Sequence, residues 1–322
     1  MSAAGRPERK GGFARVGAID CGTNSIRLLI AEERDGGGLT DLVRDLEIVR
    51  LGQGVDATGE LHPDALARTF AAAERYGGRL RSYGVKSERT RVIATSATRD
   101  ANNVEDFYAG MIARLGVRPE IVSGVEEAQL SFTGALSGVA VASDGPVLVM
   151  DIGGGSTELV VGDRTGRIAH AVSLDIGSVR LTERFGLVSL LTTEARQAAV
   201  TYVDGLLDQL EWPGGLLGQI GTWIGVAGTV TTMSALKLGL TSYDRSKVHG
   251  SILTRAEIAG LSNRLATLTT EEIHDLGVPA GRADVIPAGS LIADRVAHRV
   301  GRAMIVSESD ILDGIALSLL AH

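Results

Sequence analysis

The sequence predicts an α/β protein made of two related halves with a cleft between them. The main reason is a segment that occurs twice: an apolar run ending in Asp, a turn of Gly and hydroxyl residues, and a second apolar run. The copies span residues 16–31 and 147–161. Each copy is typical of two strands joined by a turn. A length of 322 residues also fits two domains of ordinary size.

The predicted strands and helices follow the same order in both halves. The first half is expected to contain strands at 15–20, 25–33 and 42–51, a helix at 63–83, a strand at 91–95 and a helix at 104–115. The second half is expected to contain strands at 147–151, 157–162 and 167–174, a helix at 192–211, a strand at 222–226 and a helix after Gly228. This doubled order fits the duplicated actin-like (ribonuclease H-like) architecture better than a doubly wound Rossmann sheet.

The domain boundary is expected near a helix over residues 123–138. We therefore assign residues 13–123 to a first actin-like domain and residues 124–307 to a second one. A last helix at 310–320 is expected to cross back, so that residues 308–322 join the first domain. Residues 1–12 are polar and basic and are expected to form a flexible tail. Residues 284–300 have one apolar face, which indicates a core helix without a functional role.

Composition restricts the compartment and the partners. A net charge of −7 argues against a nucleic-acid surface, and no apolar stretch is long enough to cross a bilayer. We therefore expect a cytoplasmic protein with neither a membrane nor a nucleic-acid polymer as partner. The single cysteine, Cys21, excludes a disulfide framework and is expected to pack as a small buried side chain. The six histidines lack the spacing of metal ligands.

The turns of the repeated segment are suited to binding phosphate. We call residues 22–25 the first glycine turn and residues 153–156 the second. Small residues let backbone N–H groups converge on an anion, and Thr and Ser hydroxyls add donors. A strand, not a helix, follows each turn, so neither is a P-loop or a Rossmann turn. One such turn is more often an ordinary hairpin, but two matched copies favour a site that holds a phosphate chain between them.

Acidic and basic residues near the turns supply further chemistry. Asp20 and Asp151 end the strands before the two turns, where each can hold a divalent cation. Arg99 follows a strand, and an Arg there can bind phosphate oxygens bidentately. Glu126 and Glu127 lie in the first turn of a helix, a position that the helix dipole alone favours for acids. Because adjacent residues point in different directions, one of them can enter the cleft and take a proton from an attacking water.

These segments resemble the exopolyphosphatase and guanosine pentaphosphate phosphohydrolase family. The stretches from Ala94 to Asn103, from Ser123 to Ala128, from Gly225 to Thr232 and from Val248 to Gly250 carry the resemblance together with the two turns. It runs in order from about Val16 to Leu320. The family belongs to the sugar kinase, Hsp70 and actin superfamily. The resemblance implies release of terminal phosphate from inorganic polyphosphate or pppGpp with magnesium, or manganese as the alternative ion.

The resemblance also implies roles for individual residues. Glu127 would be the general base, with Glu126 as a structural neighbour, and Asp151 and Glu158 would hold magnesium or orient the water, with Asp20 as a third metal candidate. The implied phosphate contacts are Gly22, Thr23, Asn24, Ser25, Ser96, Arg99, Gly153, Gly154, Gly155, Ser156, Thr157, Gly228 and Thr229. A helix start at Gly177 to Arg180 could also bind phosphate, and Lys247 and Arg282 are weaker candidates for a basic path.

Several alternatives remain open from the sequence. Longer family members add C-terminal helical domains, whereas this sequence ends at His322, which predicts action on shorter polyphosphates. Hydrolysis of pppGpp would use the same machinery, although an aromatic content of 4% offers few platforms for a base. A non-catalytic sensor of polyphosphate or nucleotide would make Glu127 dispensable. A sugar or acetate kinase would lack the Ser-Gly-x-Glu-Glu helix start. A homodimer is expected from general frequency.

Overall fold

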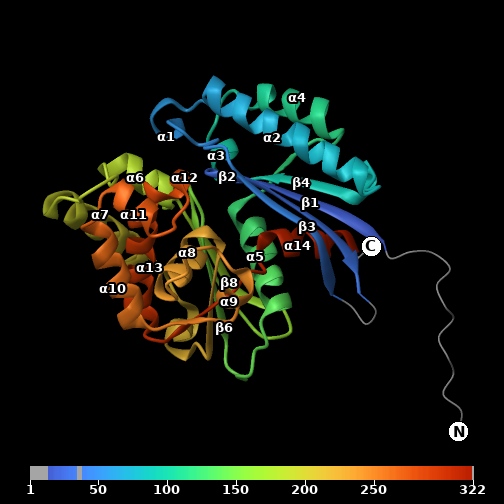
Figure 1. Cartoon of the computed structure of the whole chain (residues 1–322). Coiled ribbons are helices and arrows are strands. Elements are labelled where there is room, and N and C mark those ends of the chain that lie inside the picture. Colours follow the sequence, from blue (N-terminus) through green and yellow to red (C-terminus); the bar gives the residue numbers. More distant parts are fainter. Residues whose placement is uncertain (1–13, 35–37, 321–322) are drawn as a thin grey trace, which may run out of the picture.

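The structure is a computed structural model that describes residues 14–34 and 38–320 (Figure 1). Two mixed sheets are each covered on both faces by helices. The tail expected over residues 1–12 lies outside the described residues. Within the described part, no helix is both long and apolar enough to span a bilayer. Cys21 is buried in the first half, as expected for a packing residue.

The first sheet has the order β3-β2-β1-β4-β5. Its strands are β1 (Arg15–Cys21), β2 (Ser25–Glu33), β3 (Leu39–Ile48), β4 (Thr90–Ala94) and β5 (Glu120–Ile121). The first three form an antiparallel meander, and β4 pairs with β1 in parallel. The helices between these strands are α1 (Val55–Thr58), α2 (Pro63–Ser82), α3 (Ser96–Arg99) and α4 (Val104–Leu115).

The second sheet has the order β10-β11-β9-β6-β7-β8. Its strands are β6 (Val147–Ile152), β7 (Thr157–Gly162), β8 (Ile168–Leu174), β9 (Thr222–Val226), β10 (Ile252–Leu253) and β11 (Met304–Val306). Read from β8 to β11, it repeats the order and the strand directions of the first sheet. The duplicated actin-like fold that the sequence predicts is therefore confirmed.

Helices of the second half pack mainly on one face of this sheet. They are α6 (Ser178–Phe185), α7 (Thr193–Asp208), α8 (Ala227–Lys237), α9 (Arg245–Val248), α10 (Arg255–Ala266), α11 (Thr270–Asp275), α12 (Ala280–Ala283) and α13 (Ile286–Val300). Of these, α9, α10, α11 and α12 were not predicted, and α9 and α12 have only four residues each, too few to show a helical period.

Two helices exchange between the halves. Helix α5 (Gly124–Gly138) follows the first sheet but packs against the second, where Phe132 contacts the cluster around Val149. Helix α14 (Ile311–Leu320) follows the second sheet but packs against the first, where Ile315 joins the cluster around Leu29. Figure 1 shows α5 and α14 side by side between the two sheets. The boundaries assigned to the two domains stay a prediction.

The two exchanged helices touch through glycines. A Cβ added to Gly134 of α5 would lie 1.7 Å from the carbonyl oxygen of Asp310, and one added to Gly314 of α14 would lie 2.0 Å from the carbonyl oxygen of Leu130. These distances are far below van der Waals contact, so only glycine permits the backbones to approach this closely. The contact between the halves therefore depends on two hydrogen-sized side chains.

The strand predicted over residues 42–51 ends three residues early. The backbone N–H groups of Val49 and Arg50 both donate to the carbonyl oxygen of Asn24, at 3.0 and 2.9 Å. Arg50 has a φ of 52°, in the left-handed region, which is incompatible with a strand. The chain turns here to support the first glycine turn, and local sequence carries no sign of that distant acceptor.

Candidate active site

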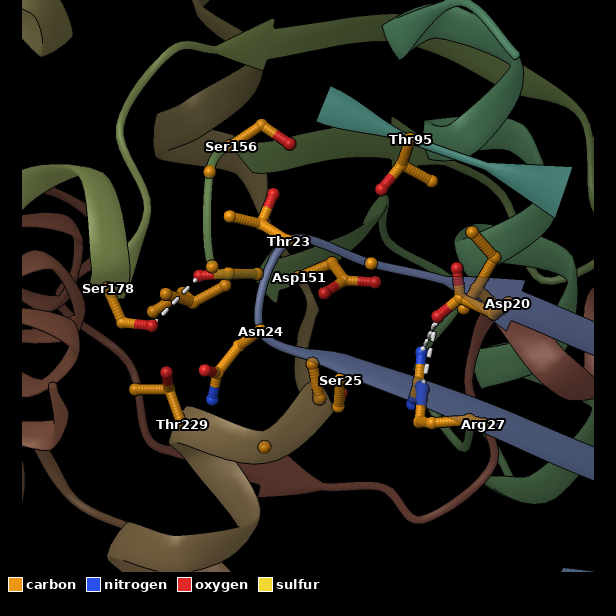
Figure 2. Close-up of a pocket in the computed structure, with 18 of the residues that line it drawn as sticks. Asp20, Thr23, Asn24, Ser25, Arg27, Thr95, Asp151, Ser156, Ser178 and Thr229 are labelled. Carbon is orange, nitrogen blue, oxygen red and sulfur yellow. Dashed lines mark hydrogen bonds and ion pairs between the residues drawn. The ribbon is translucent and has the colours of Figure 1, made fainter. Parts of the chain in front are cut away.

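The two glycine turns meet between the sheets. A Cβ on Gly154 would lie 3.0 Å from the Cβ of Thr23, and one on Gly155 would lie 2.4 Å from Ser96 Oγ and 2.7 Å from Thr23 Oγ1. Glycine is needed because a larger residue would push the turns apart. Both turns border one pocket, and Figure 2 shows Thr23 and Asn24 of the first turn beside Asp151 and Ser156.

Most of the predicted site residues line this pocket. They are Asp20, Gly22, Thr23, Asn24, Ser25, Glu127, Asp151, Gly153, Gly154, Gly155, Ser156, Gly228 and Thr229. Ser96, Arg99, Thr157 and Glu158 do not line it. Thr157 is fully buried and donates to the carbonyl oxygen of Ile176 at 2.6 Å, and Ser96 accepts from Arg180 at 3.1 Å. The start of α13 does reach the pocket through Ile286, so residues 284–300 are not purely core.

The two hairpins place different residues opposite their aspartates. Strand register sets Arg27 opposite Asp20 and Glu158 opposite Asp151. Arg27 Nη2 lies 2.7 Å from Asp20 Oδ2, the ion pair drawn in Figure 2, and Arg27 also pairs with Asp310. The first hairpin therefore balances its acid with a cation. The second keeps two carboxylates on neighbouring strands.

Hydroxyl groups hold the two carboxylates of the second hairpin. Ser131 Oγ donates to Asp151 Oδ2 at 2.5 Å, and Ser173 Oγ donates to Glu158 Oε1 at 2.7 Å. Burial raises the pKa of Asp151 to about 6 despite the hydrogen bond from Ser131. Burial, reinforced by the carboxylates of Glu127 and Asp151, raises the pKa of Glu158 well above its ordinary value. This acidic cluster favours a bound cation or retained protons.

Glu127 enters the pocket from the first turn of α5. Ser123 caps this helix by accepting from the N–H of Glu126 at 3.2 Å. Glu127 is only 8% exposed, whereas Glu126 is half-buried, with 43% of its side chain exposed, and pairs with Arg91 at 2.7 Å. The two acids point in different directions, as expected for neighbours on a helix. Burial raises the pKa of Glu127 to about 7, although Arg99 acts to lower it.

Arg99 contacts Glu127 instead of lining the pocket. Its Nη1 donates to Glu127 Oε2 at 2.7 Å and to the carbonyl oxygen of Val122 at 3.0 Å. These two bonds orient the guanidinium toward the start of α5. Arg99 therefore fixes one oxygen of Glu127, and its contact with phosphate stays a prediction.

Two arginines, Arg27 and Arg282, line the pocket and supply positive charge that the sequence analysis did not assign to it. Arg27 was missed, and Arg282 was only a weak candidate, yet both line the pocket. Arg282 is half-buried, its desolvation lowers its pKa, and it donates to Thr232 Oγ1 at 2.9 Å. A Cβ on Gly228 would lie 2.6 Å from Arg282 Nη2, so glycine makes room for this cation. Comparing the two hairpins would have revealed Arg27, which occupies the position of Glu158.

The oxygen atoms around the first turn suit a hard cation. Asp20 Oδ1, Thr23 Oγ1 and Asn24 Oδ1 are buried and have no hydrogen-bond partner. In the described residues, no three Asp, Glu, His or Cys side chains are arranged to hold a metal by themselves. Magnesium usually binds one or two carboxylates and completes its shell with water and phosphate oxygens. Asp151 and Asp20 fit that mode of binding.

A second pocket adjoins the first. The two share Arg27, Leu46, Ala227, Gly228 and Arg282. Apolar residues and one aromatic ring form much of the second pocket: Leu236, Leu240, Tyr243, Val278 and Pro279. The combined space joins a polar cradle for anions to a wall suited to a larger organic group.

Comparisons with known proteins agree with this arrangement. The model of the Ppx/GppA phosphatase family matches residues 29–322. The chain is 42% identical to Exopolyphosphatase 2 of Mycobacterium tuberculosis, over 95% of this chain and 99% of that protein. It is 31% identical to a guanosine-5'-triphosphate,3'-diphosphate pyrophosphatase of Photobacterium profundum, over 84% of this chain and 52% of that protein. The crystal structure of the Aquifex aeolicus Ppx/GppA family member matches with a TM-score of 0.79 and 30% identity, over 96% of this chain and 98% of that one.

Proposed function

The chain belongs to the Ppx/GppA phosphatase family and is a phosphatase, and from this we propose that it is an exopolyphosphatase that releases terminal orthophosphate from inorganic polyphosphate. The observation that carries the proposal is the pair of facing glycine turns with the buried carboxylate of Glu127 entering the pocket between them, beside Asp20 and Asp151. The Mycobacterium tuberculosis relative, named Exopolyphosphatase 2 and matched along nearly its whole length, supports the same substrate.

The residues have complementary parts in this reaction. Backbone N–H groups of the two glycine turns bind the phosphates at the end of the chain. Arg27 and Arg282 offset negative charge, and Glu127 takes the proton from the attacking water. Arg99 keeps Glu127 oriented through the 2.7 Å contact. Positioning and charge stabilisation account for most catalysis of phosphoryl transfer, so no covalent nucleophile is needed.

We propose magnesium, with manganese as the alternative, as the cofactor. Asp151 and Asp20 would hold it, with Glu158 behind Asp151. When bound, it neutralises charge on the phosphate oxygens. Removing divalent ions with a chelator is expected to lower phosphate release by about 10²-fold or more, an estimate from the weight of electrostatic stabilisation. Calorimetric titration of the chelated protein with magnesium, alongside Asp151→Asn, checks metal binding without activity; equal affinity in both proteins would contradict this assignment.

The substrate is tested by phosphate release from the purified protein. Polyphosphates of several defined lengths, pppGpp and ATP are supplied separately, with and without magnesium. The proposal expects release from polyphosphate at a higher kcat/KM than from the two nucleotides. Release from pppGpp alone would transfer the assignment to the alternative substrate, and no release from any of them would contradict a hydrolase acting on these anhydrides.

The pH dependence follows from the environment of Glu127. A general base must be ionised, and burial raises the pKa of this carboxyl to about 7. As the pH falls below about 7, kcat/KM is therefore expected to decrease about tenfold per unit. Rates measured between pH 5 and pH 9 in the wild type check this. A profile that stays flat down to pH 5 would show that a different group accepts the proton.

Hydrolysis of pppGpp is the second candidate function. The apolar wall of the second pocket, with Leu236, Leu240 and Tyr243, offers space for a nucleoside beside the phosphate cradle. The relative named guanosine-5'-triphosphate,3'-diphosphate pyrophosphatase supports it as well. Leu240→Gln is then expected to lower kcat/KM for pppGpp more than for polyphosphate. An equal effect on both substrates would argue that the nucleoside does not use this wall.

We also propose that the protein is a homodimer and lies in the cytoplasm. The homodimer is expected from the general frequency of such assemblies, and the location is expected from the composition. Light scattering of the purified protein measures the first, and a mass of one 33.6 kDa chain would contradict it. Fractionation of the source cells measures the second.

A further inference from the structure

Charged side chains join the two halves beside the pocket. Arg180 and Arg184 lie one turn apart on α6 of the second half, whereas Asp56 of α1 and Asp100 at the end of α3 belong to the first half. Arg180 Nη1 lies 2.7 Å from Asp56 Oδ1, and Arg184 Nη2 lies 2.8 Å from Asp56 Oδ2. Arg180 also pairs with Asp100. We call these four residues the latch; Figure 1 shows α6 next to α1.

Arg180 also holds the second glycine turn. Its Nε donates to the carbonyl oxygen of Gly155 at 2.9 Å, and its Nη2 donates to Ser96 Oγ at 3.1 Å. One guanidinium thus contacts the turn of the second half and the helix α3 of the first half. The side chain is 13% exposed and does not line the pocket between the turns.

Backbone N–H groups at the start of α6 donate to carbonyl oxygens of the second glycine turn. The N–H of Ser178 donates to the carbonyl oxygen of Gly153 at 2.9 Å, and those of Val179 and Arg180 donate to Gly154 at 2.8 and 3.1 Å. These are the donors that a phosphate at a helix N-terminus would need. The N–H groups of Ser178, Val179 and Arg180 are therefore not available to the phosphate expected at Gly177 to Arg180.

We propose that Arg180 is a positioning residue that closes the site: its pairs with Asp56 and Asp100 hold the two glycine turns together, and their release lets the halves separate. Closure matters because the phosphate cradle exists only while both turns face the same pocket. A ligand that binds only the closed form loses apparent affinity in proportion to the closed fraction. The catalytic part of this inference rests on the proposed function, whereas the closure itself does not.

If Arg180 instead binds phosphate, KM is expected to change in the opposite direction. If Arg180 bound phosphate during turnover, neutralising its two aspartate partners would free the guanidinium and lower KM. If Arg180 closes the site, the same change opens the protein and raises KM. The double variant Asp56→Asn, Asp100→Asn distinguishes the two because it leaves Arg180 and its contact with Gly155 in place.

The experiment measures shape and kinetics of the full chain. Small-angle scattering without substrate is expected to give a larger radius of gyration for the double variant than for the wild type, whose compact value is about 20 Å. With polyphosphate, KM is expected to rise about 5- to 150-fold, the usual range of coupling between states, while kcat stays within about twofold. Arg180→Lys keeps the charge but loses the fork, and is expected to raise KM less than Arg180→Ala.

A matched control is Asp144→Asn, which removes an exposed carboxylate that pairs with Arg164 at 3.4 Å. It is expected to match the wild type in both measurements. An unchanged radius of gyration in the double variant overturns the latch, and so does a lower KM. If the wild type hydrolyses none of the phosphates offered, the proposed function fails, yet scattering still decides whether the latch closes the protein.

Discussion

Replacing Glu127 with Gln is expected to lower kcat for phosphate release by about 10²- to 10⁴-fold, the usual contribution of a general base. The amide keeps the shape of the side chain and can still accept from Arg99, but it cannot take a proton from water. KM is expected to change little, because Glu127 acts on the water and not on the bound phosphates. Initial rates over a range of polyphosphate concentrations separate the two constants.

Glu126→Gln is the matched control for this experiment. Glu126 is the preceding residue on α5, but it is half-buried and pairs with Arg91 outside the pocket. Its variant is expected to keep nearly the wild-type kcat, since Glu126 does not line the pocket. An active wild type with equal kcat in Glu127→Gln would remove Glu127 from the base role. Binding without turnover in the wild type would instead favour the non-catalytic sensor.

Replacing Gly134 with Ala is expected to destabilise the protein by about 3 kcal/mol, the upper end of the usual cost of overpacking. The added methyl group would lie 1.7 Å from the carbonyl oxygen of Asp310, and backbone cannot turn aside as a flexible side chain can. Helices α5 and α14 would have to separate. Thermal unfolding is expected to show a loss of about 4 °C in Tm, from an unfolding entropy of about 2.1 cal/mol/K per residue.

Gly205→Ala is the control for helix propensity. Gly205 lies inside α7, and a Cβ there would meet nothing within 4 Å. Alanine is favoured over glycine in a helix by about 0.5–1 kcal/mol, so this variant is expected to unfold at the same or a slightly higher temperature. If both variants had the wild-type Tm, the close approach of α5 and α14 would not be important for stability.

The sequence could predict the parts of the site that local pattern controls. An apolar run, an Asp and a glycine turn appear together in the chain, so both turns and the helix start at Glu127 were recognisable. Arg27 was recognisable too, because a tight hairpin fixes which residue lies opposite Asp20. The spacing of Asp20 to Arg27 is the same as that of Asp151 to Glu158.

Contacts between distant segments could not be predicted in this way. Arg99 stands at the end of its strand, as expected, but α5 brings Glu127 within its reach and determines which acceptor it meets. Arg180 lies at a helix start, which is typical of phosphate binding, yet Asp56 and Asp100 arrive from the other half of the chain. In both cases tertiary packing determines which partner the arginine contacts, and the local sequence does not distinguish among the possible partners.

The exchange of α5 and α14 bears on how the polypeptide assembles. Cutting the chain between α5 and β6 would leave an N-terminal fragment in which one face of the first sheet lacks α14, and a C-terminal fragment in which one face of the second sheet lacks α5. Each fragment would expose an apolar face of the kind that drives association. Such fragments should be insoluble when produced singly and should recover structure when produced together, which makes this junction a natural place for a split-protein complementation assay.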